Sequence, residues 1–268
     1  MVKPILKWAG GKRWIVSNEQ LPVPSSYNRY VEPFLGGGAV FFHLQPTNAL
    51  LADLNGDLVQ LYQVIRDEPD KLWSKMKMHH RQHCTDYYYK IRAMRPRTDV
   101  TKAARLLYLN RTCWNGLYRV NLKGEFNVPI GTKDTVIFDD DDFQAVSKLL
   151  KNVELRCSDF EDILDGCGSG DFVFVDPPYT VQHNFNNFVK YNEKIFSWED
   201  QTRLRNAVLR AANRGAHIAV TNADHESIRE LYEDVGEYGQ VSRQSVLSGN
   251  PDMRGETTEA LFLSNYSK

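Results

Sequence analysis

The sequence predicts an α/β protein with a doubly wound, mainly parallel sheet and an inserted, mostly helical subdomain. Three observations lead to this prediction. Short apolar segments typical of buried strands alternate with amphipathic helical segments in both end regions of the chain. The 268 residues, 42% of them apolar, are enough for one large domain and a smaller insert. Between the end regions, residues 71–133 are strongly basic and mostly helical in pattern.

The first part of the sheet is predicted in residues 29–53, which form a strand–helix–strand unit. Residues 29–33 and the range Ala49–Asp53 have the short apolar pattern of parallel strands. Between them, residues 34–38 contain three consecutive glycines, which allow a tight loop, and the helix Ala39–Leu44 follows.

The insert is predicted to span residues 56–142. Apolar residues recur at helical spacing within residues 55–66, and further helices are expected at residues 86–94 and 101–109. Residues 117–129 mix Tyr, Val and Phe with Asn and Gly, which predicts a hairpin or long loop that presents side chains outward.

The second part of the sheet follows the insert. Its predicted parallel strands are Val153–Cys157, 172–175 and 217–221. A helix is expected to begin at Ser197, where a serine followed three residues later by an aspartate can form an N-terminal cap. Residues 240–246 and 260–264, with no long helix between them, predict an antiparallel pair at the sheet edge. Residues 1–55 and 143–268 are therefore expected to form one catalytic domain.

Charge is strongly segregated along the chain, although the net charge is only -1. Residues 71–133 hold 14 Lys and Arg against 3 Asp and Glu, a balance of +11, while the remainder holds 19 against 31, a balance of -12. Such segregation is typical of a polyanion-binding face on an otherwise acidic protein. Solvated lysine-rich helices are the alternative interpretation.

Several classes of protein are disfavoured. No stretch approaches 18 uncharged apolar residues, and the N-terminal segment, interrupted by lysines, lacks the apolar core of a secretory signal, so we expect a cytoplasmic protein. The four cysteines show no paired spacing, which predicts reduced thiols. The histidines and cysteine within residues 79–84 have no second ligand group at a comparable spacing, so no metal is expected.

The segment Asp176-Pro-Pro-Tyr179 directly follows the apolar strand at residues 172–175. Doubly wound sheets bind ligands at the carboxyl ends of their strands, so this segment is the leading candidate for a catalytic site. The alternative is a strand that ends in a proline-stopped turn with a capping aspartate.

These residue types can activate an aromatic amino group such as N6 of adenine. Its lone pair is delocalised into the ring until acceptors engage both N–H groups. The carboxylate of Asp176 and the main-chain carbonyl of Pro177 can supply two acceptors. Pro178 fixes the backbone that presents this carbonyl, and Tyr179 can stack on the base.

The spacing of the glycines argues against two other nucleotide-binding motifs. A dinucleotide fingerprint in the loop at residues 34–38 would need glycine at Phe41. A phosphate-binding loop around Lys12 would need glycine at Leu6 and serine or threonine at Arg13.

The chain resembles the Dam-type family of DNA N6-adenine methyltransferases over most of its length. The resemblance is carried, in the family's order, by Lys7-Trp-Ala-Gly-Gly-Lys12, Glu32-Pro-Phe-Leu-Gly-Gly-Gly38, Asp53-Leu-Asn55, Asn110-Arg-Thr-Cys-Trp-Asn-Gly-Leu-Tyr-Arg119, Gly124-Glu-Phe-Asn-Val-Pro129, the Asp-Pro-Pro-Tyr segment, and Gly215 before Thr221-Asn222. It implies a Rossmann-like methyltransferase fold that moves a methyl group from S-adenosylmethionine to N6 of a flipped adenine in duplex DNA. It also implies GATC as the recognition site.

The resemblance further implies a set of catalytic and cofactor-binding residues. The catalytic residues are Asp176, Pro177, Pro178 and Tyr179. The implied cofactor-binding residues are Trp8, Lys12, Phe34, Gly36, Gly38, Asp53, Asp159, Phe160 and Asp176. Asp53 resembles the family's ribose ligand, a role that fits a carboxylate at a strand end. Asp159 and Phe160 resemble the pair that holds the cofactor's adenine, although a helix N-cap is an equal alternative for Asp159.

A third implied set binds DNA, and the resemblance implies that the insert at residues 56–142 is the DNA target-recognition subdomain. Its members are Lys7, Arg111, Trp114, Asn115, Leu117, Arg119, Asn121 and Pro129. In the family, an aromatic side chain enters the duplex and an arginine reads a guanine, and Arg is the side chain that pairs bidentately with guanine O6 and N7. Trp114 departs from the family's usual tyrosine. Packing in the core is the alternative for Trp114 and Leu117.

Other functions remain open at this point. An RNA or cytosine-N4 methyltransferase would also use a proline-paired segment on a planar amino group. A catalytically idle DNA-binding relative is a second alternative, although it would have no need of cofactor ligands such as Asp53. The sequence leaves open whether the enzyme is solitary, linked to restriction or phage-encoded, and it implies no obligate protein partner.

Overall fold

The computed structural model describes residues 2–121, 123–182, 196–244 and 256–266. Contacts between Cα atoms divide the chain into two units. The helical unit contains Met1–Gly11, Leu35–Thr47 and Asp53–Cys157, and the sheet unit contains Lys12–Phe34, Asn48–Ala52 and Ser158–Lys268. The domain boundaries predicted at residues 55 and 142 follow the expected functions of the two parts of the chain, whereas the two units follow contacts between Cα atoms. The predicted boundaries stay a prediction.

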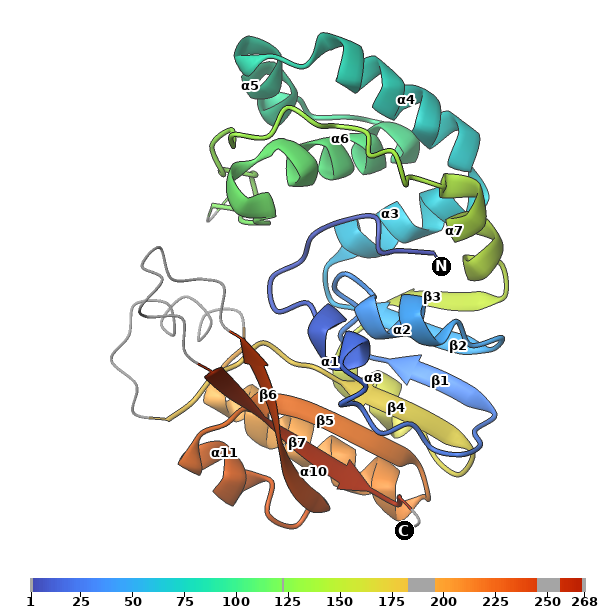
Figure 1. Ribbon diagram of the computed structural model, residues 1–268, viewed down its shortest axis with the longest axis vertical. Helices are drawn as coiled ribbons and strands as arrows, with labels where there is room; N and C mark the ends of the chain where they lie inside the picture. Colours follow the sequence, from blue (N-terminus) through green and yellow to red (C-terminus); the bar gives the residue numbers. More distant parts are fainter. Residues whose placement is uncertain (1, 122, 183–195, 245–255, 267–268) are drawn as a thin grey trace. The chain divides into compact units, whose positions relative to one another are not determined.

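The strands form one sheet with the order β3-β2-β1-β4-β5-β7-β6 (Figure 1). Their bounds are Arg29–Glu32 (β1), Ala49–Asp53 (β2), Val153–Cys157 (β3), Asp171–Val175 (β4), His217–Ala223 (β5), Glu237–Gln244 (β6) and Glu256–Ser264 (β7). Strand β1 pairs in parallel with β2 and β4, and β4 pairs in parallel with β5. Strand β7 is antiparallel to both β5 and β6. The predicted fold class is therefore confirmed, including the antiparallel edge pair.

The order of the strands reverses between β1 and β4, which are neighbours in the sheet although the whole insert separates them in sequence. Ligands of doubly wound sheets bind at such a switch point. In the edge pair, the predicted strand 260–264 lies within β7. The other predicted strand, 240–246, is described only as far as Gln244, and its last two residues lie outside the described part of the chain.

The core of the sheet unit forms around β4, all of whose residues are buried. Val173 and Val175 pack in one apolar cluster with residues of α8 (Phe160–Asp165) and α10 (Trp198–Asn213). A continuous apolar run is what a parallel strand needs when both faces of its sheet are covered. The short helices α1 (Arg13–Ser17) and α11 (Glu226–Leu231) complete the described helices of this unit.

Helix α10 begins where the sequence predicts. The amide of Asp200 donates to Ser197 Oγ at 3.1 Å, and the amide of Ser197 donates to the Asp200 carboxylate at 2.9 Å. This reciprocal capping box satisfies two amides that the helix itself leaves without a partner.

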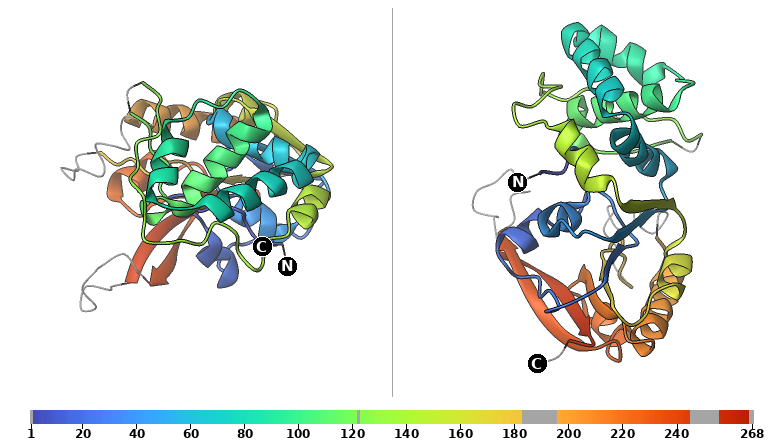
Figure 2. Two further views of the ribbon diagram at one scale, coloured as in Figure 1. Left: turned by 90° about the horizontal axis from the view of Figure 1, so that it is seen from above. Right: turned by 90° about the vertical axis from the view of Figure 1, so that its right-hand side faces the viewer.

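The helical unit is built around α6 (Asp99–Thr112), seen from further directions in Figure 2. Its other helices are α2 (Ala39–Leu44), α3 (Gly56–Asp67), α4 (Pro69–Gln82), α5 (Thr85–Ala93), a 3-10 turn at Trp114–Gly116, and α7 (Phe143–Leu150). Helices α3, α4 and α5 all contact α6. The predicted helices at residues 55–66, 86–94 and 101–109 overlap α3, α5 and α6.

Helix α4 overlaps the histidine cluster at residues 79–84, for which a phosphate-facing helix is the interpretation preferred to a metal site; its earlier part, residues 69–78, is not predicted. Its buried side is narrow, formed by Leu72, Met76 and His79, and the remaining positions are mostly polar. The ring of His79 is buried and bonds to the Tyr87 hydroxyl at 2.8 Å, and burial lowers the pKa of this histidine to about 4.

The predicted hairpin at residues 117–129 is present. Val120 and Phe126 form an antiparallel bridge, and the amide of Asn127 donates to the carbonyl of Arg119 at 3.1 Å. The side-chain oxygen of Asn121 accepts the amides of Lys123 at 2.9 Å and Glu125 at 3.0 Å. An asparagine that bonds to its own turn in this way fixes the hairpin tip.

Arg111 ties the N-terminal segment to α6 from inside the helical unit. Its guanidinium donates to the carbonyls of Ile5 at 2.9 Å and Val136 at 3.0 Å, and to the carboxylate of Asp141 at 2.7 Å. The side chains of Arg111 and Asp141 are 2% and 6% exposed, so this is a buried, bidentate ion pair.

Two further features concern only the part of the chain that the structure describes. None of its helices is both long and apolar enough to cross a membrane. Within the same residues, no three histidine, cysteine, aspartate or glutamate side chains are grouped closely enough to hold a metal ion.

Replacing Asp141 with alanine should destabilise the protein by about 3–5 kcal/mol, because the guanidinium of Arg111 would remain buried without its anion. Urea unfolding followed by circular dichroism measures the change. Asp140→Ala is the matched control, since the neighbouring Asp140 carboxylate pairs with Lys3 at the surface and should contribute nothing measurable. Equal unfolding midpoints for the two variants would contradict this account of Arg111.

Candidate active site

The Asp-Pro-Pro-Tyr segment begins directly after β4, at the carboxyl end of a central strand of the sheet. The Asp176 side chain is 17% exposed. Its Oδ1 atom accepts a hydrogen bond from Thr221 Oγ1 of β5 at 2.8 Å and lies 2.9 Å from Lys12 Nζ. A carboxylate is thus held at the strand end by one hydroxyl and one ammonium group.

Lys12 lies at the centre of a buried group of side chains, which we call the strand-end cluster and define as Lys12, Asp176, Tyr179, Thr221 and Glu259. The lysine is 3% exposed. Its Nζ atom lies 3.5 Å from Glu259 Oε2 and 4.9 Å from the centre of the Tyr179 ring. The Tyr179 hydroxyl donates to Glu259 Oε2 at 2.6 Å. The ammonium group therefore contacts two carboxylates and an aromatic face together.

Burial dominates the electrostatics of this cluster. It raises the pKa of Asp176 above the ordinary value for aspartate, and the nearby Glu259 adds to this, while Lys12 and Thr221 partly offset it. Burial and the two carboxylates also raise the pKa of Tyr179 far above its usual range, so the phenol stays protonated and donates. With both carboxylates and Lys12 ionised, the formal charge of the cluster is about -1.

The two prolines stiffen the segment between Asp176 and Tyr179. Pro177 is buried and Pro178 half-buried. Further along, the hydroxyl of Thr180 donates to the carbonyl of Phe196 at 2.6 Å, which secures the end of the segment. Because proline fixes its own backbone angle, the carbonyl of Pro177 has a defined direction before any ligand binds.

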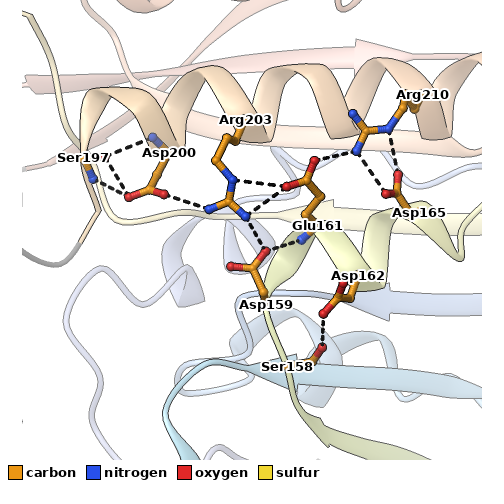
Figure 3. A network of polar contacts seen from close by, with 9 residues as sticks. All are labelled: Ser158, Asp159, Glu161, Asp162, Asp165, Ser197, Asp200, Arg203 and Arg210. Atoms are coloured by element: carbon orange, nitrogen blue, oxygen red, sulfur yellow. Dashed lines mark hydrogen bonds and ion pairs between the residues drawn. The ribbon is translucent and has the colours of Figure 1, made fainter.

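A second part of the sheet unit is aromatic. Phe34 stacks on Phe160 with ring centres 5.5 Å apart, and Phe196 contacts both rings at 5.7 Å. Asp159 caps α8 by accepting the amide of Glu161 at 2.9 Å (Figure 3). The N-cap expected as the alternative for Asp159 is thus present, and it does not preclude a further role.

Arg203 of α10 also contacts this aromatic group. Its guanidinium donates to Asp159 Oδ1 and to Glu161 Oε2, both at 3.0 Å, as Figure 3 shows. It lies 4.9 Å from the centre of the Phe160 ring. The arginine therefore holds Asp159 and Phe160 in one arrangement, although sequence reasoning did not select it.

The glycine loop and Asp53 belong to the helical unit. Oδ2 of Asp53 accepts the amide of Gly36 at 3.0 Å, and Oδ1 accepts the amide of Asn55 at 2.9 Å. Burial raises the pKa of this carboxyl, and the two amide bonds partly offset the effect. Each oxygen retains a lone pair for another donor.

Trp8 packs directly on the glycine loop. Gly36 and Gly38 have φ angles of +48° and +64°, and a Cβ atom on Gly36 would lie 2.8 Å from Trp8 Cδ1. The indole also contacts Tyr118, whose ring stacks on it with centres 5.3 Å apart. Glycine is required at position 36 both for its conformation and for this close approach.

The segment that resembles the DNA-reading part of the family lies at the surface of the helical unit. Trp114 is 52% exposed and Leu117 39% exposed, so neither packs in the core. Asn115 has a φ angle of +55°, which turns the chain between them. Arg119 is exposed, and its Nε atom donates to Asn127 Oδ1 at 2.8 Å, which orients the guanidinium.

Asn110 fixes this segment to the N-terminal chain. Its side-chain amide donates to the carbonyls of Lys7 at 2.8 Å and Gly116 at 3.0 Å, and its oxygen accepts the amide of Lys7 at 3.0 Å. The carbonyl of Pro129 accepts the amide of Trp114 at 3.0 Å. Lys7 and Pro129 are themselves exposed, and Asn121 forms the turn of the hairpin.

The structure differs from what the sequence motifs predict at two residues, Arg111 and Glu259. Arg111, expected to contact DNA, is buried and bonded to interior groups, so we leave it out of the proposed DNA-binding set. Glu259, which no motif singled out, joins the strand-end cluster. The signal that could have found it is a lone acidic residue at the start of the apolar run in β7.

Comparison with known proteins identifies the family. Residues 8–246 match the family model described as D12 class N6 adenine-specific DNA methyltransferase. A type II methyltransferase, M1.LlaDCHI of Lactococcus lactis subsp. cremoris, is 34% identical over 99% of this chain and 96% of its own length. The type II methyltransferase M.MjaIII of Methanocaldococcus jannaschii is 34% identical over 99% of both chains. A DNA adenine methylase of Haemophilus influenzae is 31% identical over 97% of this chain and 93% of its own.

The family match, the agreement along nearly the whole chain and the Asp-Pro-Pro-Tyr segment at the end of β4 lead to one conclusion. This chain belongs to the D12 class of N6 adenine-specific DNA methyltransferases.

Proposed function

We propose that the protein transfers the methyl group of S-adenosylmethionine to N6 of an adenine flipped out of duplex DNA, within the site GATC. The observation that carries the proposal is the strand-end cluster, in which Asp176 is largely buried, oriented by Thr221 and paired with Lys12. A carboxylate held in this way can accept a hydrogen bond from the amino group as its nitrogen becomes nucleophilic.

The chain's own groups act on the amino group by position and by hydrogen bonding. We propose that Asp176 accepts one N6 hydrogen and the carbonyl of Pro177 the other, while the ring of Tyr179 stacks on the flipped base. Pro178 keeps that carbonyl in place. The proton released from N6 passes to Asp176 or to solvent.

The residues present also fit the methyl donor. S-adenosylmethionine, when bound, supplies a methyl group already activated on a sulfonium. We propose that Asp53 binds its ribose hydroxyls, because both carboxylate oxygens are oriented by backbone amides and keep acceptor capacity. We propose that Trp8, with the loop of Gly36 and Gly38, offers the donor an apolar surface, and Lys12 is a further donor-binding residue that the family resemblance implies.

The adenine of the donor is assigned to the aromatic group. The stacked rings of Phe34 and Phe160 offer an aromatic surface, and Asp159 lies beside Phe160, held by Arg203. An aromatic slot with an adjacent carboxylate suits a purine, which stacks through its ring and donates through its amino group.

We propose that DNA is bound by the recognition segment, which we define as residues 110–119, and by exposed residues around it. Arg119, oriented by Asn127, would read a guanine, and Trp114 and Leu117 would enter the duplex beside the flipped base. The remaining members of the set are Lys7, Asn115, Asn121 and Pro129. GATC remains the proposed site because a guanine-reading arginine in this motif resembles that of the Dam-type family.

The alternative functions are less well supported. An RNA or cytosine-N4 specificity would not agree with a family model defined by N6 adenine in DNA. An idle relative would not need the buried pair of Lys12 and Asp176, since a buried charge pair is costly to maintain. The cytoplasmic location expected from the sequence stays a prediction.

Asp176→Ala should lower the rate of methyl transfer by at least about 10³-fold while sparing the fold and most of the DNA affinity, because the lost acceptor matters chiefly in the transition state. Single-turnover methylation of duplex DNA and a DNA-binding titration measure the two effects. Asp176→Asn, which keeps the shape, is the companion variant. Near-normal turnover in either variant would refute the proposed centre, and loss of folding in both would support the proline-turn alternative.

Asp53→Asn should weaken S-adenosylmethionine binding by about 10- to 100-fold, because it removes a charge-assisted acceptor. Trp8→Ala should have a comparable effect by removing an apolar wall, and Trp8→Phe should recover part of the loss. Isothermal titration calorimetry provides the affinities, with DNA binding in the absence of the donor as the control that should change little. Unaltered donor affinity in both variants would overturn the assignment of the glycine loop.

Arg119→Ala should relax sequence preference at one base-pair position, because a bidentate guanine contact contributes about 1–3 kcal/mol of discrimination. Methylation rates over all single-base variants of the preferred site, with binding at several salt concentrations, measure the change. Asn127→Ala, which frees the guanidinium, should relax the same position to a smaller extent.

Arg95→Ala is the control for loss of one exposed positive charge, since Arg95 pairs with Glu125 of the same hairpin. It should leave the preference at every position unchanged. If Arg119→Ala instead lowers affinity for all sequences alike and reduces the salt slope by about one unit, Arg119 contacts phosphate and does not read a base.

A further inference from the structure

The strand-end cluster contains a second carboxylate, Glu259, to which no motif assigns a role. It lies on β7, where it pairs with Ala223 of β5 and Val241 of β6, and its side chain is 5% exposed. An ion at such a depth loses most of its hydration and is retained only when its partners compensate. The groups that contact Glu259 therefore indicate its role.

Two of its contacts are with side chains of the proposed catalytic machinery. Glu259 Oε2 accepts the Tyr179 hydroxyl at 2.6 Å and lies 3.5 Å from Lys12 Nζ. Lys12 in turn lies 2.9 Å from Asp176 Oδ1. Glu259 thus fixes one end of the Tyr179 ring and shares the lysine with the catalytic carboxylate.

The charge of the cluster depends on Glu259. Asp176 alone would be neutralised by Lys12, whereas with Glu259 ionised the three side chains carry a formal charge of about -1. A sulfonium donor would bring one positive charge, and this charge passes to N6 as the bond between carbon and sulfur breaks and the bond between carbon and nitrogen forms. A nearby negative charge in a poorly hydrated site would attract that charge throughout the transfer.

We propose that Glu259 is a positioning residue for methyl transfer that orients Tyr179 and Lys12 and keeps the cluster negatively charged toward a cationic methyl donor. This inference rests on the proposed function. Glu259 itself touches neither the base nor the transferred methyl group, and it acts through the two side chains that it holds.

The charge can be tested with two ligands that differ in little else. Sinefungin carries an ammonium group in place of the sulfonium, and S-adenosylhomocysteine is neutral at that position. Glu259→Gln keeps the size of the side chain and an acceptor for Tyr179 but removes the charge. In calorimetric titrations, this variant should weaken the binding of sinefungin about tenfold more than the binding of S-adenosylhomocysteine. Glu259→Asp retains the charge and should restore most of the wild-type ratio of the two affinities.

The pH profile offers a second measurement on the same variant. The groups facing Asp176 are Lys12 from the start of α1, Thr221 from β5, Tyr179 from its own segment and Glu259 from β7. Because Glu259 raises the pKa of Asp176, removing its charge should lower that pKa. The acid limb of the methylation rate should then move to lower pH in Glu259→Gln than in the wild type.

Asp224→Asn is the matched structural control. Asp224 is also buried and also bonds to β7, through Thr258 Oγ1 at 2.7 Å, but its ion pair is with Arg229, outside the cluster. This variant should lower the melting temperature and leave both the ligand ratio and the acid limb unchanged. A purely structural role for Glu259 predicts that Glu259→Gln behaves in the same way, and that result would overturn the proposal.

Tyr179→Phe keeps the test decisive if Glu259→Gln does not fold, because it removes the hydrogen bond from Tyr179 to Glu259 and leaves the charge of Glu259 in place. It should reduce the single-turnover rate about tenfold and leave the ligand ratio at the wild-type value, since the charge remains. A wild-type rate in Tyr179→Phe would refute the orienting role. Failure of the proposed function is distinct, since the wild-type protein would then bind neither ligand or methylate no DNA.

Discussion

The ion pair of Lys12 and Asp176 is the interaction on which the rest of the catalytic site depends. Its side chains are 3% and 17% exposed, so each would be unstable at this depth without the other. Thr221 adds a hydrogen bond to the same carboxylate oxygen, and Glu259 lies on the other side of the lysine. The arrangement draws on the end of β4, on β5 and β7, and on the start of α1. The fold of the sheet unit is thereby linked directly to the chemistry of one carboxylate.

Preorganisation is the common feature of the proposed binding groups. Asp53 has each carboxylate oxygen on a backbone amide, and Pro178 fixes the carbonyl of Pro177. Arg203 holds Asp159 beside Phe160 through hydrogen bonds to neighbouring carboxylates. Side chains that are already oriented lose little freedom when a ligand binds, so more of the interaction remains for binding and for catalysis.

The recognition segment combines a fixed backbone with exposed side chains. Asn110 uses its donors and its acceptor to hold Lys7 and Gly116, and these bonds anchor the chain on either side of the exposed Trp114. The stack of Trp8 on Tyr118 joins the glycine loop to the residue that precedes Arg119. Exposed apolar side chains on a secured backbone are suited to insertion into a duplex, because the protein need not rearrange to present them.

The sequence by itself determined the features that depend on local pattern. Strand and helix alternation, the capping box at Ser197, the hairpin at residues 117–129 and the Asp-Pro-Pro-Tyr segment all follow from periodicity and turn chemistry among near neighbours. Burial was decided only by the tertiary structure. Arg111 and Arg119 lie in one family motif, yet Asp141 and the carbonyl of Ile5 hold the first inside the protein while the second is exposed. Glu259 reached Asp176 only because β7 pairs with β5. Solvation depends on what packs around a charge, and those neighbours come from distant parts of the chain.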